Sequence, residues 1–387
     1  MNRRPHDENI TSSTPPPVVV TSPPQLAALL DTLSSEPAIG VDTESNSLYA
    51  YQEQVCLIQI STPGADYIVD PLADLDITTL APIFAAPGIQ KVFHAAEYDV
   101  MCLKRDFDFH FVNLFDTMWA ARILGWPRVG LGDILNKTFG VRTKKRYQRY
   151  NWGKRPVESE ALTYASLDTH YLLPLRRLQA DALMQRGRWE EAQETFDQIA
   201  ASNPMPPNAF TPEDFWRIKG AHDLTGREQA ILRELAIWRD REASRRDRPH
   251  FKVLHDRTLV ALAQARPHTP GELTNINGLK PHHVRRYGGR ILQAIRRGMK
   301  AQPPHPLPPP PRHSREEMER FEALRTWRKR VSKEREVDVD IVVGNATLWA
   351  LAEQNPSTTE GLKSIEGLGP WKQKKYGKPI LKVLANL

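Results

Sequence analysis

The C-terminal half of the chain contains an internal sequence repeat in two copies. Three pieces recur in the same order: WR as WR, TLVALA as TLWALA, and INGLKPHHVRRYGGRIL as IEGLGPWKQKKYGKPIL. They begin at residues 238, 258 and 276 in one copy and at 327, 347 and 365 in the other, a constant offset of 89. Helical patterns dominate both copies. Because solenoids need at least about three repeats to bury a core, two copies indicate a tandem pair of small helical domains.

A proline-rich segment, QPPHPLPPPPRH at residues 302–313, separates the two copies. This composition favours a stiff, extended linker without a packed core. The length of 387 residues allows two or three domains. We predict a disordered start at 1–20, a first domain at 21–200, helical domains at 219–300 and 314–387, and a linker at 301–313.

The first domain is predicted to be an α/β layer with a mixed sheet. Short apolar or alternating runs at 38–45, 55–62, 66–70 and 90–96 indicate strands. Helical patterns follow at 97–107 and at 158–186, and residues 111–125 are typical of a strand end that continues into a helix. Strands that cluster early and then alternate with helices favour this layered architecture.

Four carboxylates and one phenol of this domain form a pattern with a chemical meaning. Asp42 and Glu44 are two residues apart at the end of a predicted strand, so both point to one face. Tyr164 and Asp168 are four apart on a predicted helix, so they lie one turn apart on one face. Asp99 opens another predicted helix. Taken singly, each is an ordinary surface or capping acid; together they indicate one site.

Such a set fits the hydrolysis of a phosphodiester with two divalent cations, Mg²⁺ or Mn²⁺. The reaction needs an activated water and charge neutralisation, which two ions about 3.5–4 Å apart supply. Hard cations prefer oxygen ligands and allow carboxylates to crowd together while ionised. Tyr164 is predicted to orient or deprotonate the attacking water, and a lowered pKa would be needed for deprotonation.

The motifs VDTES, HAAEYDV and YASLD resemble the three motifs of the DEDD exonuclease superfamily, in the branch with a tyrosine in the third motif, to which bacterial ribonuclease D belongs. LFDTMWAARILG and NWGKRPVESEALTYASLDTHYLLPL are similar to that family's flanking signatures, and the two repeats resemble HRDC domains. The resemblance implies a ribonuclease-H-like fold and a 3′→5′ exoribonuclease that releases nucleoside 5′-monophosphates. Its implied substrates are structured RNA 3′ ends, including tRNA precursors.

The resemblance also assigns roles to single residues. Asp42, Glu44, Asp99 and Asp168 would be metal ligands, and Tyr164 would position the nucleophilic water. Leu48 falls where relatives place an apolar wedge beside the terminal base; a core leucine is the equal alternative. For His94, supporting the strand end is favoured over touching the substrate. The remaining residues expected to contact RNA are Thr43, Lys145, Arg146, Tyr147, Arg149 and Trp152.

The last five of these belong to RTKKRYQRYNWGKR, in which basic residues and aromatics alternate just before the third motif. Cations would neutralise phosphates and exposed rings would stack on unpaired bases. A solvated loop is the alternative, with Trp152 packed under the helix. Basic stretches at 238–248 and 371–378 predict weak phosphate binding by at least one repeat, unless the repeats mainly pack against the nuclease and each other.

Two other functions remain open. A DNA 3′→5′ exonuclease of repair or proofreading type would use the same acids, because they do not read the 2′-hydroxyl. A non-catalytic nucleic-acid-binding protein, or a helicase fragment, would account for the repeats alone. The sequence contains no GxxxxGK[ST] loop for ATP-driven unwinding. The complete set of five residues argues for an enzyme.

Composition adds limits of its own. A net charge of +7 favours polyanionic partners modestly. The two cysteines, Cys56 and Cys102, sit in apolar sequence and are expected to be buried thiols. The sequence has no apolar run of the roughly 18 residues that span a membrane, and its start lacks the apolar core of a signal peptide. We expect a cytoplasmic monomer with no obligate protein partner.

Overall fold

The computed structural model describes residues 15–142, 145–206, 209–305 and 313–386. These residues form two compact units. One comprises the described residues of Met1–Glu44, Val55–Met205 and Pro311–Leu387, and the other those of Ser45–Gln54 and Pro206–Pro310. The first unit therefore contains the α/β layer together with the second helical repeat, and the second unit contains the first repeat.

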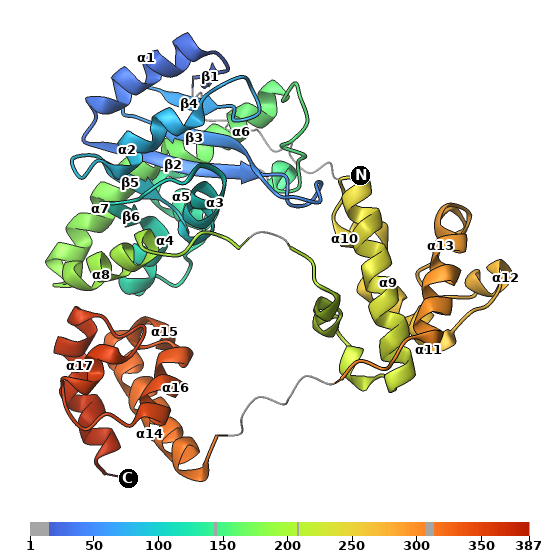
Figure 1. Cartoon of the computed structure of the whole chain (residues 1–387). Helices are drawn as coiled ribbons and strands as arrows, with labels where there is room; N and C mark the ends of the chain where they lie inside the picture. The colour runs from blue at the N-terminus through green and yellow to red at the C-terminus, as the bar shows by residue number, and fades with distance from the viewer. Residues whose placement is uncertain (1–14, 143–144, 207–208, 306–312, 387) are drawn as a thin grey trace, which may run out of the picture. The chain divides into compact units, whose positions relative to one another are not determined.

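A six-stranded sheet organises the first unit (Figure 1). Its strands are β1 (Val18–Val20), β2 (Ala38–Ser45), β3 (Val55–Ser61), β4 (Asp66–Val69), β5 (Gln90–Phe93) and β6 (Leu114–Asp116). They lie in the order β1-β4-β3-β2-β5-β6. The β1–β4, β2–β5 and β5–β6 pairs are parallel and β3–β4 is antiparallel, which confirms the predicted mixed sheet.

The two central strands differ in how they end. β3 is buried along its whole length, including its polar residues Gln59 and Ser61. β2 is buried through Val41, but its acidic end from Asp42 onward is only half-buried. The sheet therefore carries the acids at a margin that a substrate can reach. Both cysteines are buried, as predicted.

The strand β1 corrects the predicted disorder of residues 1–20 at its last three residues, Val18–Val20. Val18–Val20 pair in parallel with β4, with Val18 opposite Tyr67 and Val20 opposite Val69. Three consecutive β-branched residues suit an edge strand, where the neighbouring prolines cost no ladder hydrogen bond. The prolines on both sides of this short run hid it from the sequence pattern. Residues 1–14 lie outside the described part of the chain.

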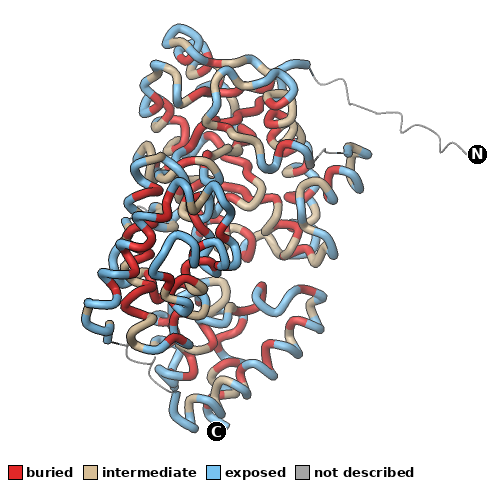
Figure 2. Tube along the Cα trace, turned by 90° about the vertical axis from the view of Figure 1, so that its right-hand side faces the viewer, coloured by how far each residue is buried: buried red, intermediate tan, exposed pale blue. Residues whose placement is uncertain are grey.

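Helices cover the sheet. They are α1 (Pro23–Ser34), α2 (Ala81–Ala85), α3 (Glu97–Phe107), α4 (Thr117–Ile123), α5 (Leu131–Phe139), α6 (Ser159–His170), α7 (Leu172–Gln185) and α8 (Trp189–Ala200). The helix expected over 158–186 is in fact two, because Tyr171 leaves the helical conformation between α6 and α7. Helix α6 packs on β3 and β4, α7 on β5 and α8 on β6. Buried and exposed positions alternate along these helices (Figure 2).

The two repeats are helical, as predicted, and fold alike. The first contains α9 (Gly226–Arg245), α10 (His250–Val253), α11 (Asp256–Ala265), α12 (Pro270–Leu273) and α13 (Pro281–Lys300). The second contains α14 (Arg315–Arg335), α15 (Val339–Val342), α16 (Asn345–Gln354) and α17 (Pro370–Leu384). No helix among all the described residues is long and apolar enough to cross a bilayer.

Equivalent residues make equivalent contacts in the two repeats. The ring of Trp238 meets Tyr287 edge-on at 5.7 Å, and Trp327 meets Tyr376 at the same distance. Glycines 278 and 367 both have positive φ, and a Cβ at either position would lie 2.2–2.3 Å from the hydroxyl of a threonine, 258 or 347. The turn that the repeated glycine makes therefore excludes any side chain.

The segment Ser45–Gln54, which follows Glu44 in the chain, packs within the second unit. The Tyr51 hydroxyl donates to Asp240 Oδ1 at 2.6 Å, and the Tyr51 amide donates to Asp247 Oδ1 at 2.9 Å. The ammonium of Lys252 lies 3.6 Å from the ring centroid of Tyr49. The first repeat thus holds the loop that connects β2 to β3.

The second repeat packs against α8. Arg335 and Glu191 form a two-pronged ion pair, with Nη1 2.9 Å from Oε1. Only 14% of the Arg335 side chain and 1% of the Glu191 side chain are exposed. Glu194 accepts hydrogen bonds from the backbone amides of Trp371 and Lys372 at the start of α17. For this copy, packing against the first domain is the alternative that the structure supports.

We expect Glu191→Ala to lower the free energy of unfolding by about 3–5 kcal/mol, because it leaves the Arg335 guanidinium buried without its carboxylate. Urea denaturation measures this difference. Glu319→Ala is the matched control, because Glu319 pairs with Arg315 on an open surface and should cost less than about 0.5 kcal/mol. Equal losses of unfolding free energy in the two variants would show that the buried pair stabilises the fold no more than the exposed pair does.

Candidate active site

The acidic end of β2 brings two carboxylates to one side of the sheet. Asp42 and Glu44 are both half-buried, and alternation along the strand places them on the same side as Gly40. A Cβ at Gly40 would lie 2.9 Å from the carbonyl oxygen of Thr169 in α6. Any larger residue would push α6 away from the strand. Gly40 therefore allows the helix that carries the third motif to lie directly on the strand that carries the first.

Asp99 joins this group from the first turn of α3 and is 7% exposed. The Thr43 hydroxyl donates a hydrogen bond to Asp99 Oδ1. This bond links the first and second motifs directly. Thr43, which we expected to contact RNA, therefore has a second role as the residue that orients this carboxylate.

Asp116 supports the start of α3 and was not identified from the sequence. Its carboxylate accepts hydrogen bonds from the amides of Ala95 and Ala96 at 3.2 and 2.7 Å, just before α3. It also caps α4 by accepting from the amides of Met118 and Trp119. The sequence did contain a signal, because an aspartate directly before a helical run is a typical N-cap.

Tyr164 and Asp168 lie one turn apart on α6, as their spacing predicts, and both are half-buried. The ring of Tyr164 lies 5.4 Å from the ring of Tyr147, tilted by 41°. This contact supports the phenol from the side of the basic segment. The site therefore draws on β2, α3 and α6, elements that are distant in sequence.

The carboxylates act on one another electrostatically. Burial raises the pKa of Glu44 to about 9, with further contributions from Asp168 and Asp99. Burial also raises the pKa of Asp42 well above its usual range, helped by Asp99, Asp168 and Glu44. Burial raises the pKa of Asp168 to about 7. For Asp99 burial raises the pKa to about 7 although the hydrogen bond from Thr43 opposes it.

These shifts describe a cluster of acids that lacks a protein cation. No described Lys, Arg or His forms an ion pair with any of the four carboxylates. Four neighbouring carboxylates favour protonation unless a positive charge compensates them. A divalent cation stabilises the ionised forms, so its binding at pH 7 would release protons.

The donor set fits hard divalent cations, although the side chains do not form a closed coordination shell. All the donors are oxygens, which Mg²⁺ and Mn²⁺ prefer. Among the described residues, however, no three His, Cys, Asp or Glu side chains are grouped closely enough to hold a metal ion as they stand. Cation binding would therefore require these carboxylates to come closer together than they are here.

The residues expected to contact RNA have mixed environments. His94 Nδ1 lies 2.9 Å from the Thr117 hydroxyl at the end of β5, and burial lowers the pKa of His94 to about 4. It is therefore a neutral support of the strand end, the role that the sequence favoured. Leu48 is 40% exposed, which excludes the core leucine that was its alternative.

The aromatic residues of the basic segment are not free to stack on bases. Tyr147 is 6% and Trp152 is 2% exposed, and both pack with Ala161 and Ala165 beneath α6. The predicted stacking of these two rings on RNA is contradicted by their burial, because stacking on a base needs an exposed ring. The sequence alternative for Trp152, packing under the helix, is the one observed.

The basic residues of this segment differ from the rings. Arg146 is exposed, lies over the ring of Tyr147 and is 3.6 Å from Glu160. Arg149 is also exposed. Both keep RNA contact as a prediction. The side chain of Lys145 lies outside the described part of the structure.

Comparisons with known proteins add a family context to this geometry. A family model described as 3′-5′ exonuclease matches residues 17–179, and the HRDC domain model matches residues 228–295 and 317–384. Ribonuclease D of Acidiphilium cryptum is 31% identical over 290 residues, which cover 74% of this chain and 73% of that protein.

Two other relatives extend the comparison. The exosome complex component 10 homolog of Caenorhabditis elegans is 34% identical over 277 residues, which cover 70% of this chain but only 31% of that longer protein. The crystal structure of Escherichia coli RNase D, an exoribonuclease involved in structured RNA processing, superposes with a TM-score of 0.69 at 25% identity. That match covers 96% of this chain and 99% of the other.

Proposed function

The chain belongs to the ribonuclease D family of 3′–5′ exonucleases, and we propose that it removes nucleotides from RNA 3′ ends as 5′-monophosphates. The convergence of Asp42, Glu44, Asp99 and Asp168 beside Tyr164, within the matched exonuclease domain, supports this proposal most directly. The ribonuclease D type of exonuclease depends on divalent metals. The four carboxylates would hold two such ions, Mg²⁺ or Mn²⁺.

Bound cations would supply charge neutralisation and an activated water. The chain's own residues would do the rest. Thr43 keeps one Asp99 oxygen in place. Burial raises the pKa of Tyr164 above its ordinary value, with further contributions from Asp168, Glu44 and Asp42. In the metal-free site the phenol therefore stays protonated. We propose that its hydroxyl orients the attacking water by hydrogen bonding.

RNA with a free 3′ end is the proposed substrate, with tRNA precursors and other structured RNAs as the cellular class. The ribonuclease D and exosome relatives favour RNA over DNA. Leu48, exposed on the loop after Glu44, is the proposed apolar contact for the terminal base. We further propose a monomer that acts in the cytoplasm.

The polarity of attack tests this proposal. With Mg²⁺ present, an RNA with a 3′-hydroxyl should be shortened to a ladder with release of 5′-monophosphates. The same RNA with a 3′-phosphate should be cut at least about tenfold more slowly, because the bulky charged end cannot enter the site. Denaturing gels and thin-layer chromatography of the products measure both.

Two further substrates separate the alternatives. Cleavage of a circular RNA would indicate an endonuclease and contradict the proposal. A DNA 3′ overhang matched in sequence to the RNA one distinguishes the sugars, and faster removal of the DNA end would favour a DNA exonuclease.

A further inference from the structure

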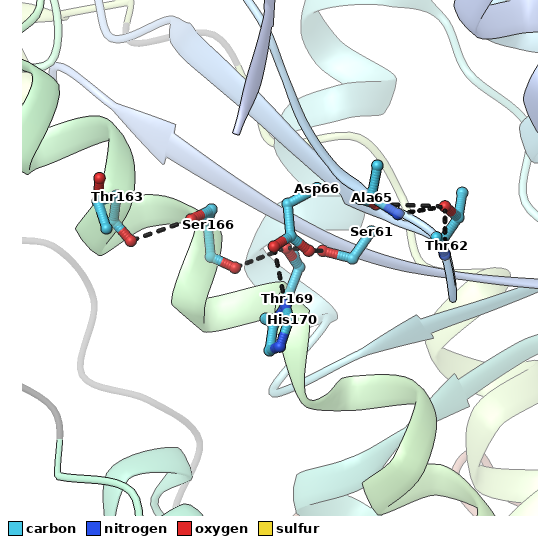
Figure 3. A network of polar contacts seen from close by, with 9 residues as sticks. Ser61, Thr62, Ala65, Asp66, Thr163, Ser166, Thr169 and His170 are labelled. Carbon is cyan, nitrogen blue, oxygen red and sulfur yellow. Dashed lines mark hydrogen bonds and ion pairs between the residues drawn. The ribbon is translucent and has the colours of Figure 1, made fainter. Parts of the chain in front are cut away.

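A buried polar network joins α6 to the hairpin of β3 and β4 (Figure 3). Ser61 Oγ lies 2.6 Å from both Asp66 Oδ1 and Thr169 Oγ1. His170 Nδ1 lies 2.8 Å from the other carboxylate oxygen, Asp66 Oδ2. The Asp66 carboxylate thus contacts one side chain of its own hairpin, Ser61, and one of the helix, His170.

The network crosses the interface between helix and sheet. Ser61 and Asp66 face each other in the β3–β4 register. Thr169 and His170 are the last two residues of α6, which ends before Tyr171. Ser61 and Thr169 are essentially fully buried, and Asp66 is 7% exposed. Three of its four members are therefore shielded from water, where hydrogen bonds are strongest, while 32% of the His170 side chain is exposed.

Stability alone is a weak explanation for a buried carboxylate in such an interface. Well-packed apolar side chains of similar volume often serve stability equally well, because burying a charge costs desolvation. Hydrogen bonds add a defined geometry, because each fixes the distance and angle between its partners. The position of this network in the chain indicates which motion of α6 it limits.

Thr169 and His170 are the two residues that directly follow Asp168. A carboxylate lies about 5–6 Å from the axis of its helix, so a rotation of about 10° moves it by about 1 Å. A displacement of that size can cost about 100-fold in rate. Two tethers next to Asp168 resist this rotation.

Close packing elsewhere on the helix does not replace the tethers. The approach of Gly40 to the Thr169 carbonyl limits how near α6 can come to β2. Tyr147 and Trp152 pack with Ala161 and Ala165 nearer the start of the helix, so its C-terminal end depends on other contacts. The polar links to Ser61 and Asp66 fix the rotation of α6 at that end.

From this geometry we infer that Asp66 and Ser61 are positioning residues for the reaction, which fix the rotation of α6 and so aim Asp168 and Tyr164 at the acids of β2 and α3. Asp66 does not touch the substrate or the reacting atoms. It acts through His170, and Ser61 acts through Thr169. The inference rests on the proposed function, since it concerns the same site.

The test measures kcat and KM on an RNA with a 3′ overhang and, separately, Mn²⁺ binding by calorimetry without RNA. Asp66→Ala should lower kcat about 10- to 100-fold with KM changed less than about threefold, and should weaken Mn²⁺ binding about tenfold, the range for residues that orient ligands. Asp66→Asn keeps the size and one acceptor oxygen, so it should recover part of both losses.

Ser61→Ala is the second variant, in case Asp66→Ala does not fold. It removes the contacts of Ser61 with Thr169 and with Asp66 but leaves the Asp66–His170 contact, and it should lower kcat about three- to tenfold. Ser166→Ala is the matched control, because the Ser166 hydroxyl is equally buried on α6 but donates to the Thr163 carbonyl of the same helix. The control should keep wild-type kcat and Mn²⁺ affinity.

The inference is overturned if the folded Asp66 and Ser61 variants keep wild-type kcat and Mn²⁺ affinity while melting at lower temperature, which is the result of a purely structural role. It is also overturned if Ser166→Ala loses as much as they do. A wild-type protein that binds Mn²⁺ but does not shorten RNA would refute the proposed function instead, and the Mn²⁺ affinities of the variants would still decide this inference.

Discussion

Replacing Asp42 by alanine is expected to lower kcat/KM for RNA shortening at least about 10³-fold, because it removes a carboxylate from the centre of the acidic cluster. Asp42 is the residue whose pKa responds to burial and then to all three of the other acids, Asp99, Asp168 and Glu44. Asp42 would therefore be central among the residues that hold the divalent cations. Single-turnover assays with Mg²⁺ on a 3′-overhang RNA measure the loss.

The fold should survive this change. Removing one of several mutually repelling carboxylates relieves repulsion, so the melting temperature should not fall. Asp31→Ala is the matched control: Asp31 is an exposed aspartate of α1, outside the cluster, and its loss should leave kcat/KM within about twofold. Wild-type activity in the Asp42→Ala protein would refute the assigned site.

Local periodicity accounts for the part of the site that the sequence predicted. The two-residue spacing of Asp42 and Glu44 has meaning on a strand, and the four-residue spacing of Tyr164 and Asp168 has meaning on a helix. Both elements are present in the structure. The meeting of these pairs with Asp99 is a property of the tertiary fold, and for it the resemblance between motifs was needed.

The contacts that hold the site together were harder to foresee. Thr43 acts through Asp99 and Asp66 acts through His170, in each case a side chain on another element. The members of the two pairs are separated by 56 and by 104 positions in the sequence, and no spacing rule connects residues so far apart. The short strand β1 was missed for a local reason, since prolines on both sides resemble a disordered tail. Partners across long sequence distances become visible only when the sheet order is known.

The basic segment before α6 shows the opposite error. Alternating cations and aromatics are typical of an RNA-binding loop, but composition does not distinguish an exposed ring from a buried one. Tyr147 and Trp152 bury their rings beneath α6, while Arg146 stays at the surface. The segment therefore supports the helix with its rings, and RNA contact by Arg146 stays a prediction.

Tyr164→Phe is expected to lower kcat about 100-fold while KM stays within about threefold, because the phenol hydroxyl is the group that orients the attacking water. Phenylalanine keeps the ring that packs on Tyr147, so the change removes one oxygen and little packing. Mn²⁺ affinity without RNA should remain that of the wild type, since the phenol is not assigned as a ligand. Stopped assays and calorimetry measure the two quantities.

Tyr67→Phe is the matched control. Tyr67 is a half-buried tyrosine of β4 in the same sheet, and removal of its hydroxyl should leave kcat unchanged. A Tyr164→Phe protein that loses Mn²⁺ binding would make the phenol a ligand. A variant with wild-type kcat would show that the carboxylates alone hold the water. Because burial and the neighbouring carboxylates raise the pKa of Tyr164, an ultraviolet titration of the metal-free protein, compared with Tyr164→Phe, should show no ionisation of this phenol between pH 6 and about 9.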